Sequence, residues 1–323
     1  MKQFLFIIAV IFVQMSCKNN GTSNNDGIQE DSLNIVTSDV KNFWAAYDRL
    51  SSSTDSVQII QKYYLDKASP EFQEFLKLRN FTAEEYVESI KKVPSFWKSV
   101  RPLTEKIELR KMELIPFFKK IKELYPPFRQ PDVCFAIGTI RTGGTTGEGL
   151  ILIGAEIAAA DSTIDKSEFD EGDFMKAVLG NTGDIMGMVA HETIHTQQPA
   201  DDENESLLKQ AISEGGADFL ASLLLGKRIM NPATFNYGTK HEESLWKEFY
   251  NDVKADKSFG DTDWFYNYRS NRPADLGYFI GYKITESYYN HSKDKKKAIK
   301  DIIEMEDPID FLEKSKYKEK YGC

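Results

Sequence analysis

The sequence is short of cysteine, of excess positive charge and of long apolar runs. Its 323 residues include only three cysteines, too few for a disulfide scaffold. The formal net charge is −9 and there is no basic block, so nucleic acid is not an expected partner. Apolar residues make up 41% of the chain, enough for a sizeable core. Together these features predict an acidic globular protein of one large domain or two small ones.

The N-terminus is typical of a signal peptide and not of a folded segment. After a positively charged start, the apolar run Phe4–Val13 is about half of the ~20 residues that a membrane-spanning helix needs. It is followed at once by Cys17, as in bacterial lipoprotein signals, although Gln14 stands where such signals usually have a leucine-like residue. We expect residues 1–17 to be a signal with lipidated Cys17, and residues 18–35 to be a flexible tether. The alternative is ordinary secretion with a free Cys17.

Residues 36–128 have the periodicity of helices. In "SDVKNFWAAYDRL", Ser38 or Asp39 is a candidate N-cap, and aromatic residues follow at helical spacing. Pro70 in "SPEFQEFLKLRN" occupies a position typical of a first helical turn. The aromatic stripes are more typical of a hydrophobic core than of a ligand site, so this region is predicted to be a helical N-terminal subdomain.

Two more helices are indicated later in the same region. "FTAEEYVESI" starts with Thr82 and has Glu85 three residues on, the pattern of a capping box. The stretch Leu103–Tyr125 is amphipathic and carries Pro116, which is expected to kink it. Two consecutive prolines then end the helical pattern.

The periodicity changes to that of strands after residue 128. The segments 132–140 and 149–157 are short, apolar and partly β-branched, and a loop rich in glycine and threonine separates them. This pattern predicts a β-hairpin with a long loop. Cys134 in the first strand is expected to be a small buried hydrophobic residue. A disulfide between Cys134 and Cys323 is the alternative.

The segment "AHETIHTQQPA" holds two of the four histidines in the chain. A helix is predicted here, with Asn181 or Thr182 as its cap. On a helix, residues four apart lie on one face, so His191 and His195 can both point at one ion. Glu192 lies one step around the helix and can reach a water molecule on that ion. This is the H-E-x-x-H arrangement of zinc-dependent hydrolases.

A catalytic zinc ion needs a third protein ligand and an open position for water. Nineteen residues after His195 comes Glu214, on a second predicted helix, and it is the candidate third ligand. Asp218 is four residues further on the same face and is expected to accept a hydrogen bond from a zinc-binding histidine. Gly215 and Gly216 are unfavourable inside a helix, which indicates that another helix or the metal centre comes close there.

These residues together resemble the gluzincin branch of zinc metallopeptidases, in which H-E-x-x-H is followed after about twenty residues by E-x-x-x-D. The resemblance implies a zincin-like fold that binds Zn²⁺. It implies that His191, His195 and Glu214 bind the ion. It also implies that Glu192 is the general base and that Asp218 orients a histidine. Ser213 departs from the asparagine that usually precedes the third ligand, which excludes a close relative of thermolysin.

A narrower resemblance covers the chain from about Val36 to the C-terminus. The lipoprotein start, the helical N-terminal part, "ILIGAE" and "LGYFIGYKITESYY" are similar to two bacterial groups. These are predicted zinc-dependent proteases of unknown function and the gliding-motility lipoprotein B-like proteins of Bacteroidota. The resemblance informs the fold more than the chemistry, because the substrates of these groups are largely unassigned.

Hydrolysis also needs a donor for the oxyanion that forms in the transition state. The candidates are Tyr278 and Tyr282, which are one turn apart on a predicted helix, and His241. Each has an alternative: the tyrosines as core aromatics with satisfied hydroxyls, and His241 as an exposed loop residue. The strand within "GLILIGAE" is expected to hold an extended peptide by edge pairing.

The sequence therefore predicts an α+β fold, mostly helical, with a zincin-like core and a small sheet over the H-E-x-x-H helix. Residues 36–128 form the helical N-terminal subdomain, and residues 129–323 form the zincin-like metallopeptidase domain. The expected function is zinc-dependent hydrolysis of a peptide or protein substrate. The alternative is a non-catalytic envelope lipoprotein that acts through protein partners in gliding or secretion machinery. The expected location is the bacterial cell envelope, with a lipid anchor as the sole membrane contact, in the outer membrane facing the periplasm.

Overall fold

The structure is a computed structural model that describes residues 33–52, 54–171, 174–179, 184–199, 206–265 and 272–322. The predicted signal peptide with Cys17 lies outside the described residues, and so does Cys323. Within them, no helix combines the length and the apolar character that crossing a membrane would require. Ile35, which the prediction placed in the tether, belongs to a strand.

The N-terminal part is helical, as predicted. Its helices are α1 Ser38–Tyr47, α2 Ser56–Tyr63, α3 Pro70–Arg79, α4 Ala83–Lys92, α5 Pro94–Thr104 and α6 Ile107–Leu124, with short 3-10 turns at Leu50–Ser52 and Leu65–Lys67. The predicted helix over Leu103–Tyr125 is two helices, since α5 ends at Thr104 and α6 begins at Ile107. α6 continues through Pro116.

Side-chain caps start α2, α3 and α4, whereas α1, α5 and α6 begin without one. Pro70 is in the first turn of α3, and Thr82 and Glu85 form the predicted capping box of α4. The N-cap of α1 is Thr37, so the expectation of Ser38 or Asp39 was wrong. Asp39 is fully buried instead and accepts a hydrogen bond from the Ser69 backbone N–H at 3.0 Å.

The sheet has four strands in the order β1-β2-β4-β3. They are β1 Ile35–Val36, β2 Asp132–Ala136, β3 Gly144–Gly147 and β4 Leu150–Gly154. β2 pairs parallel with β1 and with β4, whereas β3 pairs antiparallel with β4. The predicted hairpin between 132–140 and 149–157 was wrong, because the glycine-threonine segment expected to be its loop is itself the edge strand β3. The tight hairpin is β3-β4, and β4 is central.

A buried glutamate shapes the connection from β2 to β3. Glu156 is fully buried on α7 (Ala155–Ala158), and its carboxylate accepts hydrogen bonds from the backbone N–H groups of Gly138 at 2.8 Å and Ile140 at 3.0 Å. Ile140 has a φ of 61°, in the left-handed region that β-branched residues rarely adopt. Burial raises the pKa of Glu156 to about 7, against the lowering effect of the two backbone donors.

The remaining helices follow the sheet. They are α8 Phe174–Val178, α9 Ile185–His195, α10 Leu207–Leu225, α11 Pro232–Lys254, α12 Leu276–His291, α13 Lys295–Ile303 and α14 Pro308–Ser315, with 3-10 turns at Phe259–Asp261 and Tyr317–Tyr321. α9 is the predicted histidine helix. Its N-cap is Asp184, which accepts from the Gly187 N–H at 3.0 Å, and the predicted caps Asn181 and Thr182 lie outside the described residues.

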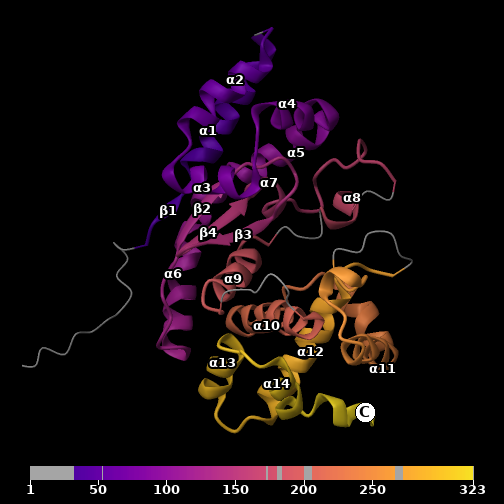
Figure 1. The fold of residues 1–323 in the computed structure, drawn as a ribbon. Coiled ribbons are helices and arrows are strands. Elements are labelled where there is room, and N and C mark those ends of the chain that lie inside the picture. Colours follow the sequence, from indigo (N-terminus) through magenta and orange to yellow (C-terminus); the bar gives the residue numbers. More distant parts are fainter. Residues whose placement is uncertain are drawn as a thin grey trace, which may run out of the picture.

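The sheet lies between the N-terminal helices and the helices that follow it (Figure 1). α9 is directly beneath the sheet and contacts β3 and β4, and α10 packs against α9 and α12. Buried side chains from both parts form one continuous core, from Val40 on α1 to Tyr317 near the C-terminus. The fold is therefore α+β and mostly helical, with a small sheet over the histidine helix, as predicted.

A close crossing of α10 and α12 confirms the prediction drawn from the helical glycines. A Cβ atom on Gly215 would lie 2.1 Å from the Tyr282 backbone nitrogen, and one on Gly281 would lie 1.6 Å from the Ala211 carbonyl oxygen. Only glycine permits two helix backbones to approach this closely. Because Glu214 precedes Gly215 directly, the crossing fixes where that carboxylate stands.

Candidate metal centre

The helix α9 carries both histidines on one face, half-buried under the sheet. The rings of His191 and His195 meet edge to face with centroids 4.5 Å apart. Their Nε2 atoms are 2.9 Å from each other, so the two imidazoles converge on one point. This follows from the spacing of four residues, which is close to one helical turn.

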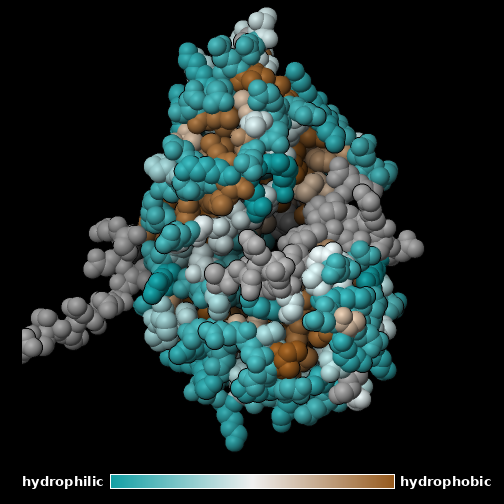
Figure 2. All heavy atoms as spheres, in the orientation of Figure 1, coloured by the Kyte–Doolittle hydropathy of each residue, from teal (hydrophilic) through white to brown (hydrophobic). Residues whose placement is uncertain are grey.

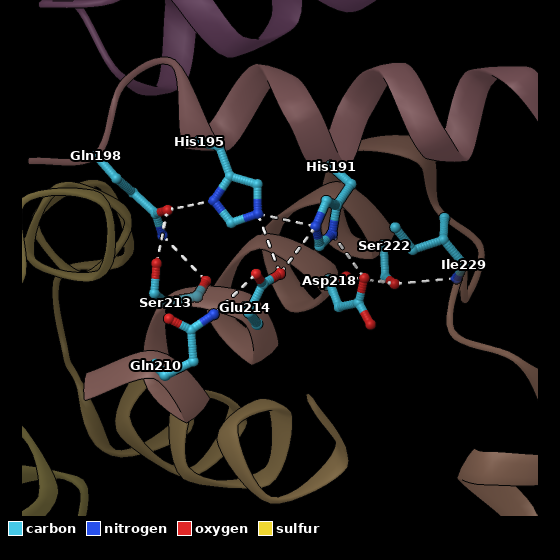
Figure 3. Close-up of polar contacts among 9 residues, drawn as sticks. All are labelled: His191, His195, Gln198, Gln210, Ser213, Glu214, Asp218, Ser222 and Ile229. Atoms are coloured by element: carbon cyan, nitrogen blue, oxygen red, sulfur yellow. Dashed lines mark hydrogen bonds and ion pairs between the residues drawn. The ribbon is translucent and has the colours of Figure 1, made fainter. Parts of the chain in front are cut away.

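The third candidate ligand comes from α10. Oε2 of Glu214 lies 3.2 Å from Nε2 of His191 and 3.2 Å from Nε2 of His195 (Figure 3). Ligand atoms of these three side chains all lie within 4.8 Å of one another. Residues that are nineteen positions apart in sequence are thus brought together by the packing of α10 against α9.

Each histidine is held from behind through its other nitrogen. Nδ1 of His191 lies 2.8 Å from Oδ1 of Asp218, and Nδ1 of His195 lies 2.7 Å from Oε1 of Gln198 (Figure 3). The Gln198 amide nitrogen donates to the carbonyl oxygen of Ser213 at 3.1 Å, so its oxygen is free to accept. With both Nδ1 atoms donating, both Nε2 lone pairs point toward Glu214.

Sequence reasoning placed Asp218 behind the histidines but missed Gln198. A glutamine three residues after the second histidine is a visible signal, since residues three apart lie on one side of a helical turn. The Ser213 side chain contributes to the same contact, because its hydroxyl donates to Oε1 of Gln198 at 3.0 Å. The serine that departs from the gluzincin pattern therefore supports the glutamine that orients His195.

The electrostatics of the cluster favour a positive charge between its members. Burial lowers the pKa of His191, but hydrogen bonds to Asp218 and Glu214 outweigh it and hold that pKa well above its usual value. Burial raises the pKa of Glu214, and the two histidines outweigh it and hold that pKa far below its usual value. A point that stabilises imidazolium and carboxylate together is also suited to a cation.

The donor set fits zinc. Two imidazole nitrogens and one carboxylate oxygen are the ligands of one class of catalytic zinc site, with the fourth position left to water or substrate. His191, His195 and Glu214 would hold the ion, and Asp218 and Gln198 would orient the imidazoles. Among the described residues, this is the group of histidine, cysteine, aspartate and glutamate side chains whose ligand atoms lie close enough for a metal.

Glu192 lies beside this cluster, against the edge strand of the sheet. A Cβ atom on Gly144 would lie 2.4 Å from Oε1 of Glu192, so β3 approaches the carboxylate as closely as a glycine allows. Burial raises the pKa of Glu192, and the charges of His191 and His195 lower it; the net pKa is above the usual value of a glutamate. A raised pKa suits a carboxylate that must take up a proton near neutral pH.

A cavity of about 770 Å³ opens over the cluster. Figure 2 shows the molecule hollowed near its middle, with mainly hydrophilic residues on the rest of this face. β3 is the strand that lines the cavity, through Gly144, Thr145 and Thr146. The expectation that the strand in "GLILIGAE" offers the edge was wrong, because that strand is β4, paired on both sides.

The two candidate tyrosines are placed differently. Tyr278 lines the cavity, and its ring is stacked on His191 with centroids 6.1 Å apart. Tyr282 is buried against Phe219 and Phe235, and it is absent from the described residues that line the cavity. Of these two, Tyr278 is therefore the one placed to act as a donor.

Two further expectations are resolved by the fold. His241 is not in a loop: it lies at a kink inside α11, where its ring contacts Tyr237 at 4.4 Å between centroids, and it is away from the cavity-lining residues that the structure describes. Cys134 is buried in β2, as expected for a small hydrophobic residue, and forms no disulfide with a described residue. A disulfide with Cys323 stays open, since Cys323 lies outside the described residues.

Comparison with known proteins places the chain in a family. The family model described as "gliding motility protein GldB" matches residues 23–319, which is nearly the whole chain. No curated protein and no solved structure matches it. The match spans the sheet, the histidine helix and the C-terminal helices alike, so the chain belongs to the gliding motility protein GldB family.

Proposed function

We propose that this chain is a lipid-anchored envelope protein of the gliding machinery, and that its histidine-glutamate centre binds zinc and hydrolyses peptide bonds. The family match supports the first part and says nothing of catalysis. The second part rests on one observation: two Nε2 atoms and Oε2 of Glu214 converge within 3.2 Å of one another, with Glu192 beside them.

Each residue of the site has a separate role in the proposed hydrolysis. Zinc supplies Lewis acidity, which activates water as a nucleophile and polarises a carbonyl group. Glu192 accepts the proton of the attacking water and returns it to the leaving amine. Tyr278, stacked beside His191, is the candidate donor to the developing oxyanion. The free edge of β3 holds the substrate backbone in an extended conformation by strand pairing.

The test combines zinc content with cleavage of a mixed peptide library by the full chain, purified in mild detergent. We expect nearly one zinc per chain in wild type and in Glu192→Ala, loss of zinc in His191→Ala, and cleavage in wild type alone. Removing the general base leaves all three ligands in place, so the Glu192→Ala variant separates metal binding from chemistry. Wild type that takes up no zinc, even after reconstitution, would contradict the metal centre itself.

A second candidate function is favoured by the family match. A gliding motility component needs no catalysis, so the chain could act as a non-catalytic assembly or interaction protein that retains the zincin-like centre. The same experiment separates the two candidates: stoichiometric zinc with no cleavage of any peptide would support the interaction protein. The presence of Glu192 argues for the enzyme, because a structural zinc centre has no use for a general base beside its ligands.

A further inference from the structure

Two arginines line the cavity together with the zinc ligands. Arg79 is the last residue of α3, and Arg141 stands three residues before β3. They are neighbours, because a guanidinium N–H of Arg141 donates to the Arg79 carbonyl oxygen at 2.5 Å. The hydrolytic mechanism given above uses neither of them.

The two guanidinium groups are held differently. Arg141 is held in place by the Phe81 ring, 4.9 Å from its centroid, and by Glu85, whose Oε1 lies 3.1 Å from one nitrogen. Nε of Arg79 is buried and has no hydrogen-bond partner among the described residues. A guanidinium group binds a carboxylate through two parallel hydrogen bonds, so the two arginines that line the cavity are suited to an acidic ligand.

The cavity lining carries both signs of charge. Glu192, Glu214 and Asp218 surround the metal centre. Asp184, another lining residue, is already paired with Lys227 at 2.8 Å. A carboxylate brought by a ligand is attracted by the two arginines, and the charge of Arg79 also reaches Glu192.

The direction of β3 determines which part of a peptide meets the arginines. β3 starts at Gly144, beside Glu192, and runs away from it to Gly147. A peptide paired antiparallel with the free edge therefore extends its C-terminal part past Gly144 toward Arg141. Arg141 and Gly144 are three positions apart, so their two Cα atoms are at most about 10 Å apart, roughly three residues of an extended peptide.

We propose, building on the proposed peptidase function, that Arg79 and Arg141 select peptides with a carboxylate shortly after the bond to be cleaved. That carboxylate is either an acidic side chain or the free C-terminus, since both present the same group to a guanidinium. The arginines would then determine specificity without taking part in the bond-breaking step.

Binding to the zinc-loaded Glu192→Ala full chain tests this without turnover. The probes are fluorescently labelled ten-residue peptides of one neutral sequence: a C-terminal amide, the same peptide with a free C-terminus, the amide with one aspartate in its C-terminal half, and the amide with one aspartate in its N-terminal half. Fluorescence anisotropy should show the second or third peptide binding about tenfold tighter than the other two. If the peptide with the free C-terminus binds more tightly, the site recognises the terminal carboxylate. If the amide with an aspartate in its C-terminal half binds more tightly, the site recognises an acidic side chain.

Single substitutions then assign the preference. Arg79→Gln and Arg141→Gln, each made in the Glu192→Ala chain, should bring the preferred peptide down to the level of the neutral amide. Arg110→Gln on α6 removes an exposed, glutamate-paired arginine away from the cavity and should change nothing. Equal binding of all four peptides, no binding of any, or a preference that survives both cavity substitutions would overturn the proposal.

The proposed peptidase function fails separately from this inference. If wild type cleaves neutral amidated peptides as fast as acidic ones, the peptidase stands and the arginine selection is wrong. If the acidic peptides bind tightly and depend on the arginines but no peptide is cleaved, the arginine site stands as a binding site and the peptidase is wrong.

Discussion

Single side chains behind the ligands decide how tightly the centre holds zinc, and Asp218 is the clearest example. Its carboxylate accepts from Nδ1 of His191 at 2.8 Å and keeps the Nε2 lone pair directed at the metal position. Asp218→Asn keeps the shape but removes the charge, and zinc affinity should fall by about 10- to 100-fold. Competition against a chelator of known affinity measures this. Asp310→Asn, at an exposed residue of α14, is the control, and unchanged affinity in Asp218→Asn would exclude the orienting role.

A second residue, Glu156, should make stability depend on pH. Its pKa is raised to about 7 by burial, so the folded state favours the protonated form more than the unfolded state does. The free energy of unfolding should therefore fall as pH rises from about 4.5 to about 7, by an amount on the order of 3 kcal/mol, and stay level above that. Glu156→Gln carries no titrating proton, so this part of the pH dependence should vanish. Urea unfolding of both proteins at pH 5 and pH 7.5 tests it, and parallel pH profiles would count against it.

The candidate ligands could be located from the sequence because their geometry is mostly local. Four residues on a helix bring His191 and His195 together whatever the rest of the fold does. Glu214 was the first suitable acid on the next helix. Gln198 and Arg79 were not identified, because a glutamine after a histidine or an arginine at a helix end has many uses. What selects them is the packing of segments far apart in sequence.

Among the elements, β3 shows where sequence patterns are insufficient. The two apolar segments were correctly identified as strands, but their parallel pairing depends on a chain crossing that no local pattern encodes. The segment Gly144–Gly147 has no apolar residue and resembles a loop. It is a strand because it pairs with the side of β4 that β2 leaves open, and because α9 contacts it from below. The very residues that weakened its strand signal, the glycines, permit its approach to Glu192.

That approach predicts a loss of activity when β3 gains a side chain. In Gly144→Ala the new Cβ would stand 2.4 Å from Oε1 of Glu192, so the Glu192 side chain or β3 must shift and the carboxylate loses its place beside the metal centre. We expect kcat/KM to fall by about 100-fold, as for a catalytic group displaced by about 1 Å, with zinc content unchanged. Gly147→Ala is the matched control, because its Cβ would be in ordinary contact with the Leu150 Cβ at 3.8 Å and with Leu78 Cδ1 at 4.0 Å. Equal kinetics in the two variants would show that β3 does not constrain the base.

The crossing of α10 and α12 predicts a sharp contrast between neighbouring glycines. Gly215→Ala would force a Cβ to within 2.1 Å of the Tyr282 backbone nitrogen, and backbone atoms cannot yield as side chains do. It should lower the free energy of unfolding by ~1–3 kcal/mol or more, as overpacking does. Gly216→Ala would meet the Ile302 methyl group at 3.3 Å and the Thr285 hydroxyl at 3.6 Å, and should be nearly neutral. Urea unfolding compares them, and equal stabilities would argue against the close crossing.

For the whole molecule, the centre joins two helices of one continuous core, so zinc binding and folding should be linked. His191 and His195 come from α9 and Glu214 from α10, and in an unfolded chain these ligands are not held together. Zinc that binds only the folded state at a free concentration of 100 times its Kd stabilises it by about 2.7 kcal/mol. For a chain of this size that amounts to a rise in Tm of about 5 °C or more.

The variants show whether that rise comes from this centre. Zinc should raise Tm in wild type and in Glu192→Ala, since both keep the three ligands, and the rise should be lost in His191→Ala and reversed by a chelator. Differential scanning calorimetry with and without zinc measures it. A rise of the same size in His191→Ala would place the zinc elsewhere on the molecule. No rise in wild type would mean that His191, His195 and Glu214 hold no zinc. The proposed peptidase would then have no activated water to act as its nucleophile.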